Sequence, residues 1–563
     1  MKPNTKNILK ALLLLLSPFG GWGASSCTEP DSNLVSFVEN NTLSTPNDTL
    51  YSFMGIINKM QKVADRTVVL GEIRGDLTTL TENATLELQD VANFNVGTLN
   101  PYNNARDYYA IIQNCNYYIA HADTSLTKRG DKVFLKEYAA IKAYRAWTYL
   151  QLALNYGSVP FFTEPLLTEL DANPSLYPKY DVNQIAEYFI KDLSKLEDVQ
   201  YPNYGSINGI NSKFFYIPIR VLMGDLCLWS GKYEEAAQYY HDYLTKTGDI
   251  HPIYDASVRW RDYQFQEISD GYASQFPTSG TDNIHTLTII PMEEDEYNGI
   301  QSFLKDIFTS TEDNNYYYQA THSVAYDRLS QSQKYTLLFT DPVTGVQHPI
   351  SPADTLAYES DQLRGDLRQQ SIYSLRNQAS NSTSYSSIRQ NVMKHRSNHV
   401  CIYRLEYVYL RYAEALNRAG YPYSAFAILK YGLTQENITK HVPKDEAEAA
   451  KPLISFSEHT FLRSNTVGLH SRGCGDVDED STYAIPQGLT KDQTLLFVEN
   501  KICDEMALET ATEGQRYYDL MRIALHRNDP SFLASKVAMR DGTLNLELHS
   551  KLCDKKNWYL TLE

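Results

Sequence analysis

Three glutamates near the end of the chain have a spacing that suits acid–base chemistry. Glu505, Glu509 and Glu513 follow one another every four residues, so a helix would place their carboxylates on one face. Two carboxylates that flank a glycosidic bond can hydrolyse it. However, Arg516 follows Glu513 by three residues and Asp519 follows Arg516 by three, and opposite charges at this spacing pair on a helix. The pattern therefore favours structural ion pairs over an acid–base pair.

An alternation of aspartates resembles the first half of a calcium loop. Asp476, Asp478 and Asp480 stand at the first, third and fifth places of such a loop. An EF-hand has glycine at the sixth place and glutamate at the twelfth, where this chain has Ser481 and Gln487. An ordinary acidic loop is therefore the simpler interpretation, and the three aspartates remain a weak calcium candidate.

Other metal and catalytic motifs are weak or absent in the sequence. His470, Cys474 and Asp476 could form part of a zinc site, but the usual second Cys or His pair is missing. The GxSxG, P-loop and HExxH motifs do not occur. No motif therefore recommends catalysis, and apart from the weak calcium candidate we expect no metal and no cofactor.

Residues 71–95 form the first region with side chains suited to a polar ligand. Arg74 and Asp76 could form paired hydrogen bonds with neighbouring sugar hydroxyls. Phe94 could offer a ring face, with Asn95 beside it. The alternative is a structural ion pair between Arg74 and Asp76.

A second candidate region lies in a polar stretch with no periodic need for large aromatics. Its candidate ligand residues are Trp260, Tyr263, Tyr316 and Tyr317. Aromatic faces with polar groups nearby suit a flat polar ligand, and a concave site needs only a few such groups. We therefore expect these loops to contact ligand.

The composition limits the classes of partner. The chain has 563 residues with 51 basic and 68 acidic ones, a net charge of −17, which argues against nucleic acid because binding phosphates needs a basic face. Tyrosine is abundant, with 43 residues against 5 tryptophans, and most of these rings should pack in the core. The cysteines that follow position 27 show no CxxC pair, and we expect most to be buried apolar residues: Cys115, Cys227, Cys401, Cys474, Cys503 and Cys553.

The first 26 residues have the features of a signal peptide. Three early lysines precede a short apolar stretch, residues 11–16, and small residues lead to Cys27. This arrangement resembles a bacterial lipoprotein signal, with Cys27 as the lipidated N-terminus, although Ala24 replaces the usual leucine. The alternative is ordinary cleavage after Ala24 or Ser26. Glu29 and Asp31 resemble signals that sort lipoproteins of the Bacteroidetes group to the outer face of the cell.

The rest of the chain is predicted to be mostly helical. Apolar residues recur at helical spacing between residues 46 and 70, and further helices are predicted over 102–122, 131–156 and 181–196. Asp131 and Asp181 are the expected N-caps of the last two.

Two segments share the spacing of a tetratricopeptide-like helix pair. In residues 217–248, Gly224 and Ala236 offer close approach, Gly231 a turn, and Tyr240 a large packing group. Residues 411–433 repeat this spacing, because Gly420 precedes Ala425 by five residues just as Gly231 precedes Ala236. Ala413 and Leu429 take the places of Gly224 and Tyr240. Helices approach closely only where small residues face each other, so both segments are predicted to be helix pairs.

The predicted organisation is a tether followed by one domain. Residues 27–45 are polar and form a flexible lipidated tether, and residues 46–563 form a single helical domain. Two long irregular excursions with little β structure, over about 249–400 and 441–493, are predicted to carry ligand-binding loops.

Four motifs resemble the SusD/RagB family of nutrient-uptake lipoproteins, in the family's order. They are YNNARDYYAIIQNCNYY (102–118), EYAAIKAYRAWTYLQLALNYGSVP (137–160), YRLEYVYLRYAEALNRAG (403–420) and EMALETATEGQRYYDLMR (505–522). Cys503 and Asp504 replace the usual Glu-Arg before the last motif, and residues 468–479 are not part of the general signature.

The resemblance implies a fold, a function and a partner. Members have about four tetratricopeptide-like helix pairs in a curved scaffold, and they are lipid-anchored on the outer membrane. They bind nutrient oligomers, usually glycans and in some cases peptides, and deliver them to a SusC-type TonB-dependent β-barrel. They are not enzymes.

Three other functions remain open from the sequence. The first is a peptide-binding member of the same scaffold, which would present a deep groove with free backbone donors. The second is a glycoside hydrolase on a helical scaffold, which would need two free carboxylates in a cleft. The third is a purely structural helical adaptor, whose loops would present a flat surface without ligand.

Overall fold

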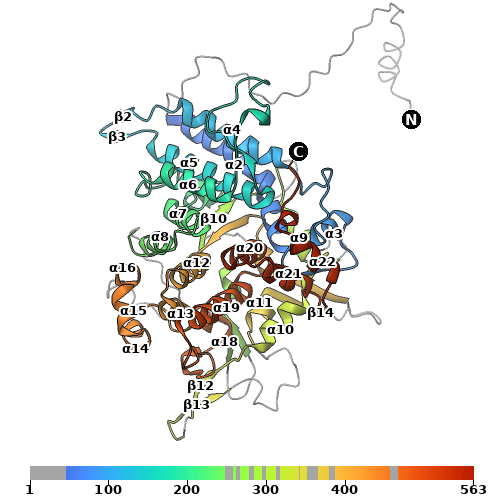
Figure 1. Ribbon diagram of the computed structural model, residues 1–563, viewed down its shortest axis with the longest axis vertical. Helices are drawn as coiled ribbons and strands as arrows, with labels where there is room; N and C mark the ends of the chain where they lie inside the picture. The colour runs from blue at the N-terminus through green and yellow to red at the C-terminus, as the bar shows by residue number, and fades with distance from the viewer. Residues whose placement is uncertain are drawn as a thin grey trace, which may run out of the picture. The chain divides into compact units, whose positions relative to one another are not determined.

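The first half of the scaffold is a succession of helices in which each packs against the next. The computed structural model describes residues 46–246, 258–261, 267–277, 285–293, 299–311, 317–341, 343–350, 365–378, 387–456 and 467–562. Its first helices are α2 (Pro46–Glu72), α3 (Leu86–Ala92), α4 (Ala105–His121), α5 (Leu135–Tyr156), α6 (Val182–Leu193), α7 (Ile219–Trp229) and α8 (Tyr233–Lys246). Helices α2, α4, α5, α6, α7 and α8 follow one another in space as in sequence (Figure 1).

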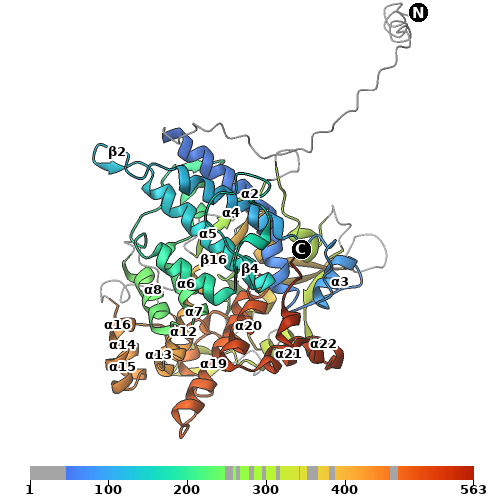
Figure 2. The same cartoon turned by 45° about the horizontal axis from the view of Figure 1, so that its top comes forward.

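The helices of the second half extend the stack beyond α8, and the last of them pack back against the first helices. Its helices are α9 (Leu304–Phe308), α10 (Val324–Ser332), α11 (Arg368–Ile372), α12 (Leu405–Arg418), α13 (Pro422–Lys430), α14 (Gln435–His441), α15 (Lys444–Ala449), α16 (Lys451–Ile454), α18 (Ser471–Cys474), α19 (Lys491–Thr510), α20 (Arg516–Arg527), α21 (Pro530–Ala538) and α22 (Leu546–Leu552). Helix α12 packs on α8 and α13, and α19 packs on α12 and α13. Helix α20 packs on α2, so the last part of the chain lies against the first helix (Figure 2).

The strands of the described residues form small antiparallel pairs. They are β1 (Thr78–Leu80) with β11 (Ala320–His322), β2 (Thr127–Lys128) with β3 (Asp131–Lys132), β4 (Val159–Pro160) with β5 (Lys179–Tyr180), β6 (Ser206–Ile207) with β7 (Ile210–Asn211), β8 (Val258–Arg261) with β9 (Glu267–Asp270), β10 (Thr286–Ile290) with β16 (Val400–Arg404), β12 (Leu337–Thr340) with β13 (Gln347–Ile350), and β14 (Tyr373–Gln378) with β15 (Ser387–Val392). The prediction of a mostly helical fold with little β structure is confirmed. The two excursions hold more regular structure than expected, because hairpins and short helices recur through them.

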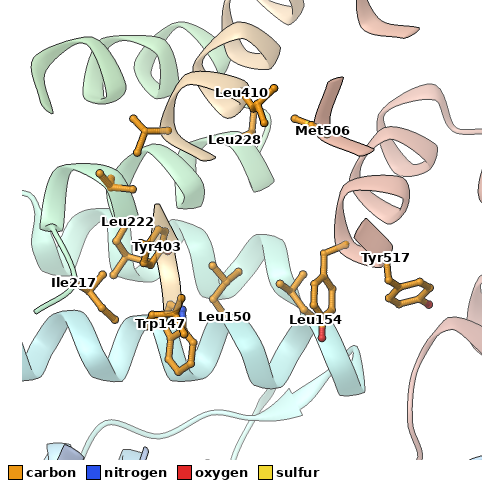
Figure 3. Packing of buried hydrophobic residues seen from close by; sticks show 14 of the residues in the cluster. Trp147, Leu150, Leu154, Ile217, Leu222, Leu228, Tyr403, Leu410, Met506 and Tyr517 are labelled. Atoms are coloured by element: carbon orange, nitrogen blue, oxygen red, sulfur yellow. The ribbon is translucent and has the colours of Figure 1, made fainter. Parts of the chain in front are cut away.

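The core runs between the helices and continues into the β10–β16 pair. Trp147, Leu150 and Leu154 lie along one side of α5, where Tyr403 of the second half lies close to Trp147 (Figure 3). Met506 belongs to the same buried cluster and lies nearer Leu410 (Figure 3). Residues 43–563 form one compact unit. Within the described part of the chain, no helix combines the length and the apolar character needed to cross a membrane.

Of the two aspartates expected to be helix N-caps, one caps its helix and the other does not. Asp181 caps α6 and accepts a hydrogen bond from the Gln184 amide, while the Gln184 side chain reaches back to the Asp181 amide. Asp131 was expected to cap α5 but lies in strand β3, and Phe134 occupies the N-cap instead. A β-turn at Arg129–Gly130, where both residues have positive φ, forms a hairpin that the helical pattern does not reveal.

Both predicted helix pairs are confirmed. Helices α7 and α8 pack on Gly224, where an added Cβ atom would lie 2.5 Å from Tyr240 Cε1. The hydroxyl of Tyr240 donates a hydrogen bond of 2.6 Å to Asp225, so the ring cannot turn away freely. Helices α12 and α13 form the second pair, with Ala413 and Ala425 fully buried.

Replacing Gly224 with leucine is expected to destabilise the fold without changing ligand choice. The new side chain must displace the buried Tyr240 ring, and overpacking of this kind costs about 1–3 kcal/mol. Urea unfolding followed by circular dichroism measures the change. Gly97→Leu is the control, because Gly97 lies in a loop with nothing within 4 Å of the new Cβ atom. Unchanged unfolding of the Gly224 variant would contradict the close contact between α7 and α8.

Candidate functional site

The three glutamates of the sequence pattern lie in a buried ion-pair network. Arg404 donates hydrogen bonds to Glu513 at 2.8 Å, to Glu406 at 2.6 Å and to Glu509 at 3.1 Å. Arg368 contacts Glu509 at 2.9 Å and lies 2.6 Å from Glu505. All six side chains are buried. Structural pairing was expected here, and the structure confirms it.

The partners of these glutamates are not the ones that helical spacing predicted. Glu513 pairs with Arg404 and Lys394 instead of Arg516. Arg516 binds Asp76, which is 440 residues away, and both oxygens of the carboxylate take part, at 2.6 and 3.0 Å. Tertiary contacts determine these pairs. A buried charge is costly unless an opposite charge lies beside it, and the fold supplies that opposite charge from a distant segment.

The network keeps its carboxylates ionised. Burial opposes ionisation of Glu509, but the guanidinium groups of Arg472, Arg404 and Arg368 lower the pKa of Glu509 to about 2. The same kind of contact, with Arg404 and Lys394, lowers the pKa of Glu513 against the effect of burial. A general acid must hold a proton near neutral pH, so these glutamates do not suit that role.

Other motif residues also point into the core. Arg522 binds Glu414 through Nε at 3.0 Å and Asp519 at 2.7 Å. Arg145 donates a hydrogen bond of 2.9 Å to Asn116, which joins α5 to α4. These motif residues therefore supply contacts that hold the scaffold together.

Arg74 and Asp76 are not available to a ligand, and the expectation for them was wrong. Arg74 is buried and donates hydrogen bonds to Asn155 at 2.6 Å and to the Trp558 carbonyl at 3.2 Å, and its guanidinium stacks on Tyr517. Asp76 is occupied by Arg516. The alternative, an ion pair between Arg74 and Asp76, is not formed either. Arg74 binds the Trp558 carbonyl, and Asp76 pairs with Arg516, both from the C-terminal part of the chain.

Phe94 and Asn95 lie at the surface end of α3. Phe94 is half-buried and packs against Tyr517 with ring centroids 5.6 Å apart. Asn95 is exposed, and its side-chain oxygen accepts a hydrogen bond from Lys551 of α22. Of the four candidate residues in the first region, only Phe94 and Asn95 therefore reach the surface.

Tyr317 lies on a segment that contacts the start of α3, at the opposite end of that helix from Phe94 and Asn95. Strand β11 pairs with β1, and Thr81 donates hydrogen bonds to the carbonyls of Tyr318 and Gln319. The side chain of Gln319 accepts a hydrogen bond from Thr85, the N-cap of α3. The structure thus brings part of the second candidate region beside the first, which sequence separation alone did not reveal.

Sequence reasoning missed three exposed apolar residues on segments that belong to or adjoin α3 and β11: Leu86 lies in α3, Leu99 precedes Asn100, and Phe303 precedes α9, which packs on β11. Leu86, Leu99, Phe303 and Tyr317 are between 40% and 98% exposed, and we call these four residues the α3 surface. Asn100 ties the loop of Leu99 to α3 by donating to the Glu87 carbonyl at 3.1 Å. A lone leucine in a polar segment gives no periodic signal, so only the fold reveals this grouping.

The remaining candidates of the second region are placed elsewhere or lie outside the description. Trp260 belongs to β8, which packs against α18, a different part of the scaffold from α3. Tyr263 and Tyr316 fall outside the described residues, as do Cys27 and the signal segment. Trp260, Tyr263 and Tyr316 therefore stay predictions.

The calcium candidates do not converge on one point. Asp476 accepts a hydrogen bond of 2.8 Å from the Leu338 amide, and Asp480 is buried and accepts from Thr482 at 2.6 Å. Asp478 is exposed. Asp476 is bound by the Leu338 amide and Asp480 by Thr482 of its own loop, so the weak calcium prediction is not supported.

Two cavities among the described residues are too small for an oligomer. One, of about 50 Å³, lies beside Lys394 and Arg404, and the other, of about 30 Å³, lies between Trp147, Gln151 and Arg411. Pockets for small molecules usually measure about 300–1,000 Å³. These two cavities suit a few water molecules at most.

Solved structures with the same fold come from Bacteroides. A SusD superfamily protein from Bacteroides fragilis superposes with a TM-score of 0.56 at 17% identity, over 91% of this chain and 95% of its own. One from Bacteroides vulgatus gives 0.53 at 12% identity over 92% of each chain. A SusD-like carbohydrate binding protein from B. fragilis gives 0.52 at 14% identity, over 86% of this chain and 88% of its own.

No family model and no curated protein matches the chain. The structural likeness nevertheless extends over most of the described helices and most of each solved chain. This chain therefore has the fold of these SusD superfamily structures.

Proposed function

We propose that this chain binds nutrient oligosaccharides at the cell surface and delivers them to a SusC-like TonB-dependent transporter, without catalysing a reaction. The observation that carries the proposal is the fold, because one structure with this fold is described as a carbohydrate binding protein and another as a putative sugar binding protein. The buried, ion-paired state of the glutamates supports a role without catalysis.

The α3 surface supports binding at an open face. An exposed tyrosine can stack on a sugar ring, and its neighbours Phe303, Leu86 and Leu99 extend the apolar area. A peptide-binding protein of the same fold is the second candidate. A peptide usually needs an edge or groove that offers backbone hydrogen bonds, whereas an aromatic face suits glycans.

Replacing Tyr317 and Tyr316 together with alanine is expected to weaken oligosaccharide binding about tenfold or more. The loss of an aromatic anchor costs about 1–3 kcal/mol of binding free energy. Calorimetry with the glycans selected by a glycan array measures the affinity, and thermal unfolding of the same samples should show little change. Trp260→Ala tests the other loop in the same way.

Tyr201→Ala is the matched control. Tyr201 is also an exposed tyrosine, but it stacks on Tyr216, away from α3. Its affinity for glycan should equal that of the unchanged protein. Equal losses in both variants, or loss of stability with intact binding, would contradict a site at Tyr316 and Tyr317. Binding to peptides but to no glycan would favour the second candidate.

Replacing Cys27 with alanine is expected to release a folded protein from the membrane. The proposed lipid is the anchor, and a polar tether contributes nothing to the core. Fractionation of cells that lack the barrel partner measures attachment, and circular dichroism measures folding. If the variant remains with the membrane fraction, Cys27 is not the anchor.

A further inference from the structure

Three side chains of types that bind metals meet in the core, away from the α3 surface. Asp366 precedes α11, and His470 and Cys474 lie four residues apart around α18. One potential ligand atom from each lies within 4.8 Å of the others, and the Cys474 sulfur is 3.4 Å from Asp366 Oδ2. All three residues are buried. The sequence suggested His470 and Cys474 with Asp476, but the fold supplies Asp366 in place of Asp476.

The groups behind these ligands hold them in position. Glu505 lies 2.7 Å from His470 Nδ1, and a carboxylate of this kind orients the imidazole of many metal sites. The backbone amide of Arg368 donates to Asp366 at 2.9 Å, and its guanidinium donates to the same carboxylate. Gly473 makes room for the carboxylate, because an added Cβ atom would lie 1.9 Å from Asp366 Oδ1.

Tyr483 provides a second observation that points to a missing ligand. Its ring stacks on His470, with centroids 4.0 Å apart and planes inclined by 4°. The side chain is 6% exposed, and its hydroxyl has no hydrogen-bond partner among the described residues. A buried hydroxyl without a partner loses free energy, so an ion or its bound water at this point would satisfy it.

The charges around the cluster favour an added cation. The surrounding network joins four basic side chains, Arg368, Arg404, Arg472 and Lys394, to five acidic ones, Asp366, Glu406, Glu505, Glu509 and Glu513. With neutral histidines this network carries one net negative charge. A divalent cation that displaces the thiol proton of Cys474 to solvent adds one net positive charge and balances it.

We propose that Asp366, His470 and Cys474 bind a structural divalent metal of the zinc class. A sulfur, a nitrogen and an oxygen donor form a ligand set typical of zinc. Zinc bonds of about 2.0–2.3 Å place tetrahedral ligands about 3.3–3.8 Å apart. The sulfur and the carboxylate already have this separation, and the histidine nitrogen lies within 4.8 Å of both. A water molecule would complete the tetrahedron as the fourth ligand, and the partnerless hydroxyl of Tyr483, whose ring stacks on His470, is a candidate to bind that water.

Cobalt binding to the purified full chain tests this site. Co²⁺ bound to a thiolate gives a charge-transfer absorption in the near ultraviolet, and Zn²⁺ should abolish it by competition. We expect one equivalent of Co²⁺ per chain and a higher melting temperature in the presence of Zn²⁺, because a ligand bound only to the folded state stabilises it. A wild-type chain that shows neither the absorption nor bound Zn²⁺ after exhaustive dialysis would overturn the proposal.

Variants assign the binding to this cluster. Cys474→Ser should lose the charge-transfer absorption and bind Zn²⁺ at least tenfold more weakly, and Tyr483→Phe should keep the absorption. Cys115→Ser is the matched control, because Cys115 is also a buried free cysteine but lies in α4, and its metal binding should be unchanged. If Cys474→Ser does not fold, His470→Gln takes its place. Full metal binding by the Cys474 or His470 variant would show that the ions bind elsewhere and that the cluster belongs only to the ion-pair network.

Discussion

Replacing Arg404 with methionine is expected to lower the free energy of unfolding by about 3–5 kcal/mol. The guanidinium contacts Glu406, Glu509 and Glu513, and its removal leaves three buried carboxylates with fewer positive partners. Methionine has a similar length, so the loss reports on the charge more than on the packing. The midpoint of urea unfolding measures it.

Two further variants separate charge from geometry at this position. Arg404→Lys keeps the charge but cannot reach all three carboxylates, so its loss should be smaller than that of the methionine variant. Arg106→Met removes an exposed arginine of α4 and should change stability by less than about 0.5 kcal/mol. Equal stability of the Arg404 and Arg106 variants would contradict the role given to the network.

Replacing Gly71 with alanine is expected to cost about 3 kcal/mol or more, the upper end of the range for overpacking. An added Cβ atom would lie 1.7 Å from the Gly514 carbonyl oxygen, so α2 and the chain before α20 touch backbone to backbone. Gly514 has a positive φ of 74° and would itself bring a Cβ atom to 2.5 Å from Val68 Cα. Neither backbone can give way as a flexible side chain would.

The same helix provides the control for this substitution. Gly55 also lies in α2 but is exposed, and nothing lies within 4 Å of an added Cβ atom. Gly55→Ala should therefore stabilise the protein by about 0.5–1 kcal/mol, because alanine favours a helix over glycine. Thermal unfolding of the two variants should shift in opposite directions, and shifts of the same sign would contradict the contact between Gly71 and Gly514.

The sequence predicted those parts of the fold that depend on neighbours along the chain. Gly224 and Tyr240 belong to one helix pair, and Asp181 caps the helix that follows it directly, so short spacings were sufficient. Asp131 shows the limit, because the same residue type that caps helices also suits a hairpin turn.

The candidate site was harder to predict because its contacts join distant segments. The sequence places Arg74 and Asp76 close together, as in a polar pair. In the core, however, Arg74 binds Asn155 and Asp76 binds Arg516. Helical spacing identifies partners three or four residues away and cannot select one arginine among many at a distance. The pairing of β1 with β11, which brings Tyr317 to α3, carries no sequence signal for the same reason.

The contact between the first helix and the last helices also bears on how the chain folds. The end of α2 meets Gly514, Arg74 donates to the carbonyl of Trp558, and Arg540 donates to the carbonyl of Ile73. These are contacts between residues more than 400 positions apart, and closing such loops slows folding. Helix α2 therefore cannot complete its packing during synthesis. It must wait until almost the whole chain has left the ribosome, and until then its apolar face needs protection from aggregation.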